Sequence, residues 1–294
     1  MSQLCAYDDG SIITLSQGHT HYKVFGSSGP WYVLVHGFSM NGAAWNPLPQ
    51  EMVERFKCRV LVYDYYGRGY SAKPSAPQTV GFFDRQLWEL VDRICGDDAR
   101  VTLMGLSMGS AIATVAASTT PRRVNGLIAL VPPGMKLMPL EFMVKVMRAP
   151  FLGYLLTWAC ANSVVKGRIQ RRETKDFHVQ PVNGAVIDTY MRMMSRTYAD
   201  GQFVFTARDT LRYYDAIHNL RPYAKVVGRS SFPVDVINAQ HDNICPPSEE
   251  AWKEDVPRAK THWVPTGHMC TWEDYPKVRD LLFTILARQQ QCNS

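Results

Sequence analysis

The sequence lacks several features that would place it in a special class of protein. It has no uninterrupted apolar run of the ~20 residues that a membrane-spanning helix needs. It also has no long block of like charges of the kind found in disordered or nucleic-acid-binding tails. Charged residues make up 20% of the chain and the formal net charge is +6. This mildly basic balance suits acidic ligands or an anionic membrane surface, but it is too small to indicate a nucleic-acid partner.

The seven cysteines are scattered and form no C-x-x-C pair, and there is no cluster of histidines. This pattern argues against both a zinc site and a disulfide framework, so we expect no metal and no cofactor. The first ten residues carry neither the basic nor the apolar segment of a signal peptide. We therefore expect a cytoplasmic protein, with a peripheral position on intracellular membranes as one option.

What the chain does contain is an alternation of short apolar runs and amphipathic segments, which predicts an α/β fold. The expected strands are 11–15, 21–25, 31–35, 59–63, 101–106, 126–131, 233–238 and 261–264, and the expected helices include 45–55, 80–95 and 275–289. Strands that alternate with helices form a mostly parallel sheet with right-handed crossovers. We expect about eight strands flanked by helices.

The alternation is interrupted between residues 134 and 230, where no apolar strand run occurs. Helical segments rich in methionine and aromatic residues are expected at 140–147 and 151–158. We therefore predict a helical cap at 134–230, inserted between two parts of the core at 1–133 and 231–294. The uncharged run at 149–165 is too short and too polar to span a bilayer, and we interpret it as a buried or interfacial cap helix.

Gly105-x-Ser107-x-Gly109 lies between an apolar strand run and a helical run of small residues. In this strand–turn–helix context the central serine occupies a strained, exposed position, and the glycines avoid steric clashes beside it. A serine hydroxyl needs a general base, and the base needs an orienting acid. Asp242 and His268 each follow a late predicted strand, so they would reach the same sheet edge as Ser107. His241 could compete as the base, but Gly267-His268 fits that position better.

The reaction would also need two backbone donors for an oxyanion. The N–H of Met108 follows the predicted nucleophile directly, and the N–H of Phe38 follows the strand that ends at His36-Gly37. We expect these two groups to form the oxyanion hole. His36 is expected to support this loop rather than to react.

Taken together, these residues resemble the α/β-hydrolase fold, in the capped branch that includes monoacylglycerol lipases, other esterases and C–C hydrolases. The resemblance covers residues from about 10 to 290 and is carried by His36-Gly37-Phe38, Asp64-x-x-Gly67-x-Gly69-x-Ser71, Gly105-x-Ser107-x-Gly109, Asp242-x-x-x-Pro246 and Gly267-His268. It implies a structural role for Asp64. Ala239 and Ser110 stand where the family often has glycine. Ser107 stands where epoxide hydrolases and haloalkane dehalogenases have aspartate, which argues against both activities.

The resulting hypothesis is a serine hydrolase that cleaves lipophilic acyl esters, with monoacylglycerol as the favoured substrate. It would use a Ser107–His268–Asp242 triad and an acyl-enzyme. A C–C bond hydrolase or thioesterase with the same triad, acyl transfer to an alcohol, and a non-catalytic receptor remain alternatives. The predicted cap carries a surplus of basic residues: Lys136, Lys145, Arg148, Lys166, Arg168, Arg171, Arg172 and Lys175. They form either a surface that docks on anionic lipid or a solvated helix face.

Overall fold

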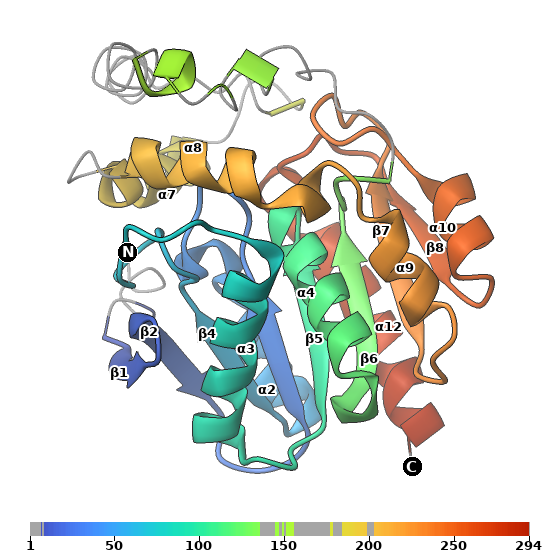
Figure 1. Cartoon of the computed structure of the whole chain (residues 1–294). Coiled ribbons are helices and arrows are strands. Elements are labelled where there is room, and N and C mark those ends of the chain that lie inside the picture. Colours follow the sequence, from blue (N-terminus) through green and yellow to red (C-terminus); the bar gives the residue numbers. More distant parts are fainter. Residues whose placement is uncertain are drawn as a thin grey trace.

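A computed structural model describes residue 7 and residues 9–135, 145–146, 149, 151–155, 177–178, 184–198 and 203–293. Its centre is one eight-stranded sheet with the strand order β1-β2-β4-β3-β5-β6-β7-β8 (Figure 1). The strands are β1 (Ser11–Leu15), β2 (Gly18–Phe25), β3 (Trp31–Val35), β4 (Arg59–Tyr63), β5 (Val101–Leu106), β6 (Val124–Leu130), β7 (Val234–Ala239) and β8 (Lys260–Val264). The predicted strands are therefore present, with ends that differ by a few residues.

The sheet is parallel from β4 to β8, and β1 and β2 add an antiparallel edge. All residues of β3 and β5 are buried. Continuous apolar character is expected for central strands that are covered by helices on both faces. In the register of these two strands Val35 lies opposite Gly105, so the loops that follow them leave the sheet side by side.

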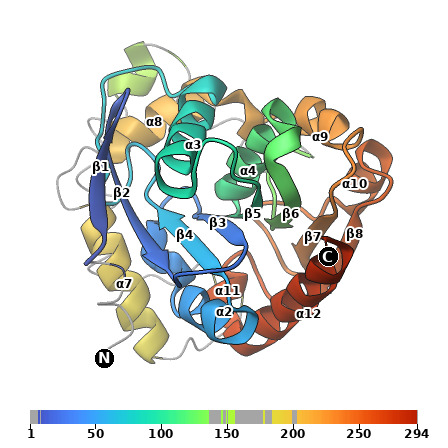
Figure 2. The ribbon, with the colours of Figure 1, turned by 90° about the horizontal axis from the view of Figure 1, so that it is seen from below.

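Two hydrophobic clusters occupy the two faces of the sheet, because successive side chains of a strand point to opposite sides. Val33 and Val35 belong to one cluster, with α3 (Val80–Cys95), α4 (Met108–Thr119), α9 (Arg221–Val227) and α10 (Glu249–Asp255). Tyr32 and Leu34 belong to the other, with α2 (Leu48–Phe56) and α12 (Tyr275–Asn293). Figure 2 shows α3, α4 and α9 on one side of the sheet and α2 and α12 on the other.

Between β6 and β7 the described residues contain helices and no strand. These are α7 (Gly184–Tyr198), α8 (Phe203–Tyr213), the short 3₁₀ helix Asp215–Ile217 and α9. Figure 1 shows α7 and α8 across the end of the sheet where β5 and β6 finish. Residues 151–155 are helical, whereas most of the two helices predicted at 140–147 and 151–158 lies outside the described residues. The division into core and cap stays a prediction.

Within the ranges given above, no helix combines the length and the apolar character that a bilayer crossing requires.

Candidate active site

The turn between β5 and α4 holds Ser107 in a backbone conformation that residues other than glycine rarely adopt, with φ 54° and ψ −122°. Such a conformation costs of order 1–3 kcal/mol and persists only where the surroundings enforce it. The surroundings of this turn are tightly packed. A Cβ on Gly105 would lie 2.2 Å from the Gly109 carbonyl oxygen, and a Cβ on Gly109 would lie 2.1 Å from the Val35 carbonyl oxygen. The motif therefore needs glycine at both positions.

Ser110, at the position where the family often has glycine, contributes to the same turn. Its hydroxyl lies 2.8 Å from the carbonyl oxygens of both Gly105 and Leu130, and the Ser107 N–H donates to Leu130 as well. The Ser110 side chain thus ties the turn to β6.

The three side chains predicted to form a triad lie in hydrogen-bond contact. His268 Nε2 is 2.9 Å from Ser107 Oγ, and His268 Nδ1 is 2.8 Å from Asp242 Oδ2. Ser107 and His268 are 161 positions apart in the chain. Their contact arises because β5, β7 and β8 are parallel, which brings the loops at their carboxyl ends to one edge of the sheet.

Asp242 is fixed by backbone donors. Its Oδ1 accepts the N–H groups of Ile244 at 2.9 Å and Cys245 at 2.8 Å, which leaves Oδ2 for the imidazole. Burial by itself would lower the pKa of His268, but the neighbouring Cys245 and Asp242 side chains outweigh this effect and raise it above its ordinary value. The arrangement favours a proton on Nδ1 and a strongly basic Nε2 facing the serine.

The loop after β3 lies next to the serine, and its peptide plane is held by several donors. The Gly37 carbonyl oxygen accepts from the Tyr65 hydroxyl at 2.8 Å and from the Met40 N–H at 3.3 Å, and His36 Nδ1 lies 2.8 Å away. The carbonyl of Gly37 and the N–H of Phe38 belong to one planar peptide and point in opposite directions. Fixing the Gly37 oxygen therefore fixes the direction of the Phe38 N–H.

His36 is buried and stacks on the Tyr65 ring at a centroid distance of 4.1 Å. Burial lowers the pKa of His36 to about 4, so at neutral pH the ring is uncharged and its Nδ1–H can donate to Gly37. The side chain is thus placed to support the loop, as expected from the sequence. The second predicted oxyanion donor, Met108, is the first residue of α4 and directly follows Ser107.

Asp64 sits beneath this loop and makes contacts that fit the structural role implied for it. Its Oδ1 accepts from the Tyr7 hydroxyl at 2.8 Å and the Gly42 N–H at 2.7 Å, and its Oδ2 accepts from the Tyr70 N–H at 2.9 Å. Burial opposes ionisation, but hydrogen bonds and the nearby His21 keep the pKa of Asp64 below its ordinary value. The carboxylate joins Tyr7, the loop after β3 and the loop after β4.

The competing histidine lies elsewhere. His241 is exposed and stacks on His178 at a centroid distance of 3.9 Å, whereas His268 contacts the serine.

His262 pairs with Asp235 at 2.7 Å. Among the described cysteines, Cys58, Cys95, Cys245 and Cys270 are free thiols.

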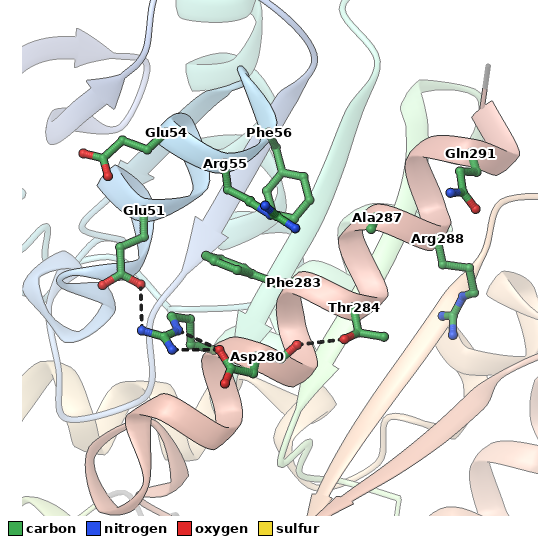
Figure 3. Close-up of a pocket in the computed structure, with 11 residues that line it drawn as sticks. Glu51, Glu54, Arg55, Phe56, Asp280, Phe283, Thr284, Ala287, Arg288 and Gln291 are labelled. Carbon is green, nitrogen blue, oxygen red and sulfur yellow. Dashed lines mark hydrogen bonds and ion pairs between the residues drawn. The ribbon is translucent and has the colours of Figure 1, made fainter.

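A groove of about 930 Å³ lies between α2 and α12. Figure 3 shows Phe56 and Phe283 between the two helices, with Glu51, Asp280 and Arg288 among the polar residues that line the groove. Its lining, in the part of the chain that the structure describes, includes none of the three predicted triad residues. This hollow is therefore separate from the candidate active site.

Comparison with known proteins gives the family. Residues 30–275 match the α/β hydrolase fold family. The chain belongs to this family. Among solved structures it is similar to an enol-lactonase from Burkholderia xenovorans, with a TM-score of 0.75 and 19% identity over 94% of this chain and 100% of that one. It is also similar to a thermophilic esterase from Thermogutta terrifontis, with a TM-score of 0.72 and 22% identity over 96% of this chain and 99% of that one. At these identities the similarity shows the fold.

Curated relatives match a shorter segment. A pimeloyl-[acyl-carrier protein] methyl ester esterase from Aliivibrio salmonicida is 36% identical over 98 residues, which cover 33% of this chain and 34% of that protein. An uncharacterized protein from Mycobacterium tuberculosis is 32% identical over 112 residues, which cover 37% of this chain and 32% of that protein. The chain thus aligns with about a third of the length of these relatives.

Sequence reasoning missed the residues that support the site. Tyr65 and Arg68 contact the loop and residues of the predicted oxyanion hole, and Tyr7 contacts Asp64, yet no spacing rule marks them. Tyr65 and Arg68 do fall within the Asp64–Ser71 motif, and that position was the available signal.

Proposed function

We propose that this α/β hydrolase is a serine hydrolase that cleaves carboxylic esters through an acyl-enzyme on Ser107. The observation that carries the proposal is the unbroken hydrogen-bond chain from Ser107 Oγ through His268 to Asp242. His268 Nε2 takes the serine proton as the oxygen attacks the acyl carbon, and later returns it to the leaving alcohol. Water then attacks the acyl-enzyme with the same base. Asp242 holds the imidazole in the reactive tautomer.

The oxyanion of each tetrahedral intermediate is received by the N–H groups of Met108 and Phe38. The support for Phe38 is the set of donors that fixes the adjacent Gly37 carbonyl. A preorganised donor of this kind contributes roughly 3 kcal/mol of transition-state stabilisation in serine proteases.

For the substrate we propose a lipophilic acyl ester, with monoacylglycerol as the favoured case. The described part of the predicted cap exposes large apolar side chains: Phe151 at 82%, Tyr154 at 51%, and Leu152 and Leu155 at 49% each. An apolar surface of this kind suits contact with a lipid aggregate. Of the basic cap residues singled out in the sequence, Lys145 is described and exposed, and the others lie outside the described residues.

The first experiment is labelling with a fluorophosphonate probe, comparing the wild-type protein with Ser107→Ala. We expect labelling in the wild type and none in the variant. Folded wild-type protein that resists the probe and hydrolyses no ester would overturn the proposal and favour the receptor alternative. Hydrolysis of p-nitrophenyl esters from acetate to palmitate then tests the substrate class, since the proposal requires a preference for long chains. A matched pair of oxygen ester and thioester separates the thioesterase alternative.

Membrane contact is tested separately by flotation with vesicles that contain phosphatidylglycerol. We expect Phe151→Ser/Leu155→Ser to reduce vesicle binding. Ile12→Ser is the control, because Ile12 is 63% exposed but lies on β1. Equal flotation of both variants and the wild type would rule out this surface.

A further inference from the structure

Arg68 is completely buried between the loop after β3 and helix α8. Its guanidinium carbon lies 4.9 Å from the centroid of the Phe38 ring and 4.8 Å from that of the Phe203 ring. The first ring belongs to the predicted oxyanion residue, and the second is the first residue of α8. Burying a guanidinium carries a large desolvation cost, so its hydrogen bonds determine whether this position is tolerated.

Those hydrogen bonds connect two separate parts of the molecule. On one side, Arg68 Nε donates to the Phe38 carbonyl oxygen at 2.6 Å. On the other, its two terminal nitrogens donate to Thr206 Oγ1 at 3.3 Å and Thr210 Oγ1 at 3.2 Å. A guanidinium is planar and rigid, so it holds these acceptors in a fixed mutual arrangement.

The contact surface on α8 is one face of the helix. Phe203, Thr206 and Thr210 are spaced three and four residues apart, which places them in a row. The helix also approaches the loop after β4 closely: Thr206 Oγ1 donates to the Gly67 carbonyl at 3.1 Å, and a Cβ on Gly67 would lie 2.9 Å from Thr206 Cβ. The Thr210 hydroxyl in turn contacts Gln78.

We propose that Arg68 is a positioning residue that couples the seating of α8 to the Phe38 half of the oxyanion hole. With α8 seated, the two threonine hydroxyls orient the guanidinium, and Nε fixes the peptide that follows Phe38. Tyr65 and His36 fix the peptide that precedes it. Displacement of α8 removes two acceptors from Arg68 and releases one of the two restraints on Phe38. This inference rests on the proposed esterase function. It implies that both restraints on the Phe38 half of the oxyanion hole are in place only when α8 covers the site.

The experiment uses Thr206→Val/Thr210→Val, which removes both hydroxyls while keeping the shape of the side chains. The control is Thr197→Val on α7, because Thr197 is also a buried threonine bonded to its own helix, at Met193. We expect the double variant to lose roughly tenfold in kcat with KM changed less than twofold, because an oxyanion donor acts in the transition state. A trifluoromethyl ketone inhibitor should weaken by the same factor as kcat/KM. Thr197→Val should keep the wild-type values.

A second measurement separates this inference from the proposed function. Hydrogen exchange of the segment 36–42 should become faster in the double variant and not in Thr197→Val, whether or not any ester is hydrolysed. Unchanged exchange in this segment, or a lower Tm with unchanged kcat, would overturn the coupling. Failure of fluorophosphonate labelling in the wild type would instead count against the proposed function alone.

Discussion

The Tyr65 hydroxyl donates to the Gly37 carbonyl oxygen at 2.8 Å, and it also lies 3.7 Å from the sulfur of Met108. One buried side chain therefore touches Met108, which is one predicted oxyanion residue, and Gly37, which directly precedes the other. The contact with Gly37 restrains the direction of the Phe38 N–H, because both groups belong to one planar peptide.

Replacing Tyr65 with phenylalanine should lower kcat about fivefold and leave KM nearly unchanged, because a hydrogen bond worth about 1 kcal/mol is lost from a group that acts in the transition state. Steady-state kinetics with a short p-nitrophenyl ester measures both constants. Tyr63→Phe is the matched control, since Tyr63 is equally buried and its hydroxyl has no hydrogen-bond partner among the described residues. Equal kcat values for the two variants would contradict the role of Tyr65.

The rate should fall as the pH is lowered, with a midpoint above the ordinary histidine value of about 6.5. The reason is that only neutral His268 can accept the serine proton, and its neighbours Cys245 and Asp242 raise its pKa. A wild-type midpoint at or below 6.5 would contradict this prediction.

Gly109→Ala should prevent folding or cost more than about 3 kcal/mol, because the new Cβ would lie 2.1 Å from a backbone oxygen of β3 that cannot move away freely. Gly81→Ala is the contrasting variant. Gly81 lies in α3 with nothing within 4 Å of its Cβ position. Alanine there should therefore raise the free energy of unfolding by about 0.5–1 kcal/mol. Urea unfolding measures both. A Gly109→Ala protein of wild-type stability would show that the turn is not tightly packed.

Tyr7→Phe should destabilise the fold by about 2 kcal/mol, since it removes a buried hydrogen bond to the charged Asp64 carboxylate. Tyr214→Phe provides the comparison: Tyr214 is as deeply buried, but its hydroxyl has no partner in the described structure. That variant should be neutral or slightly stabilising. Thermal unfolding of the two variants measures the difference. Equal Tm values would show that the Tyr7 contact contributes nothing to the stability of the fold.

The sequence by itself determined the strand order along the chain, the Ser107 turn and the candidate acid and base. Each of these depends on short-range information. Continuous apolar runs mark β3 and β5, and glycines two positions on either side of Ser107 mark a turn that tolerates no side chain there. A histidine and an aspartate after late strands could then be assigned to one sheet edge, because parallel strands end together.

Only the tertiary structure decided which side chains support that edge. Tyr65 contacts Gly37 across 28 positions, Tyr7 contacts Asp64 across 57, and Arg68 contacts Thr206 across 138. No periodicity relates the members of these pairs, since each contact depends on how a loop and a distant element pack against each other. Local patterns record which face of an element is buried, but they do not record the partner that buries it.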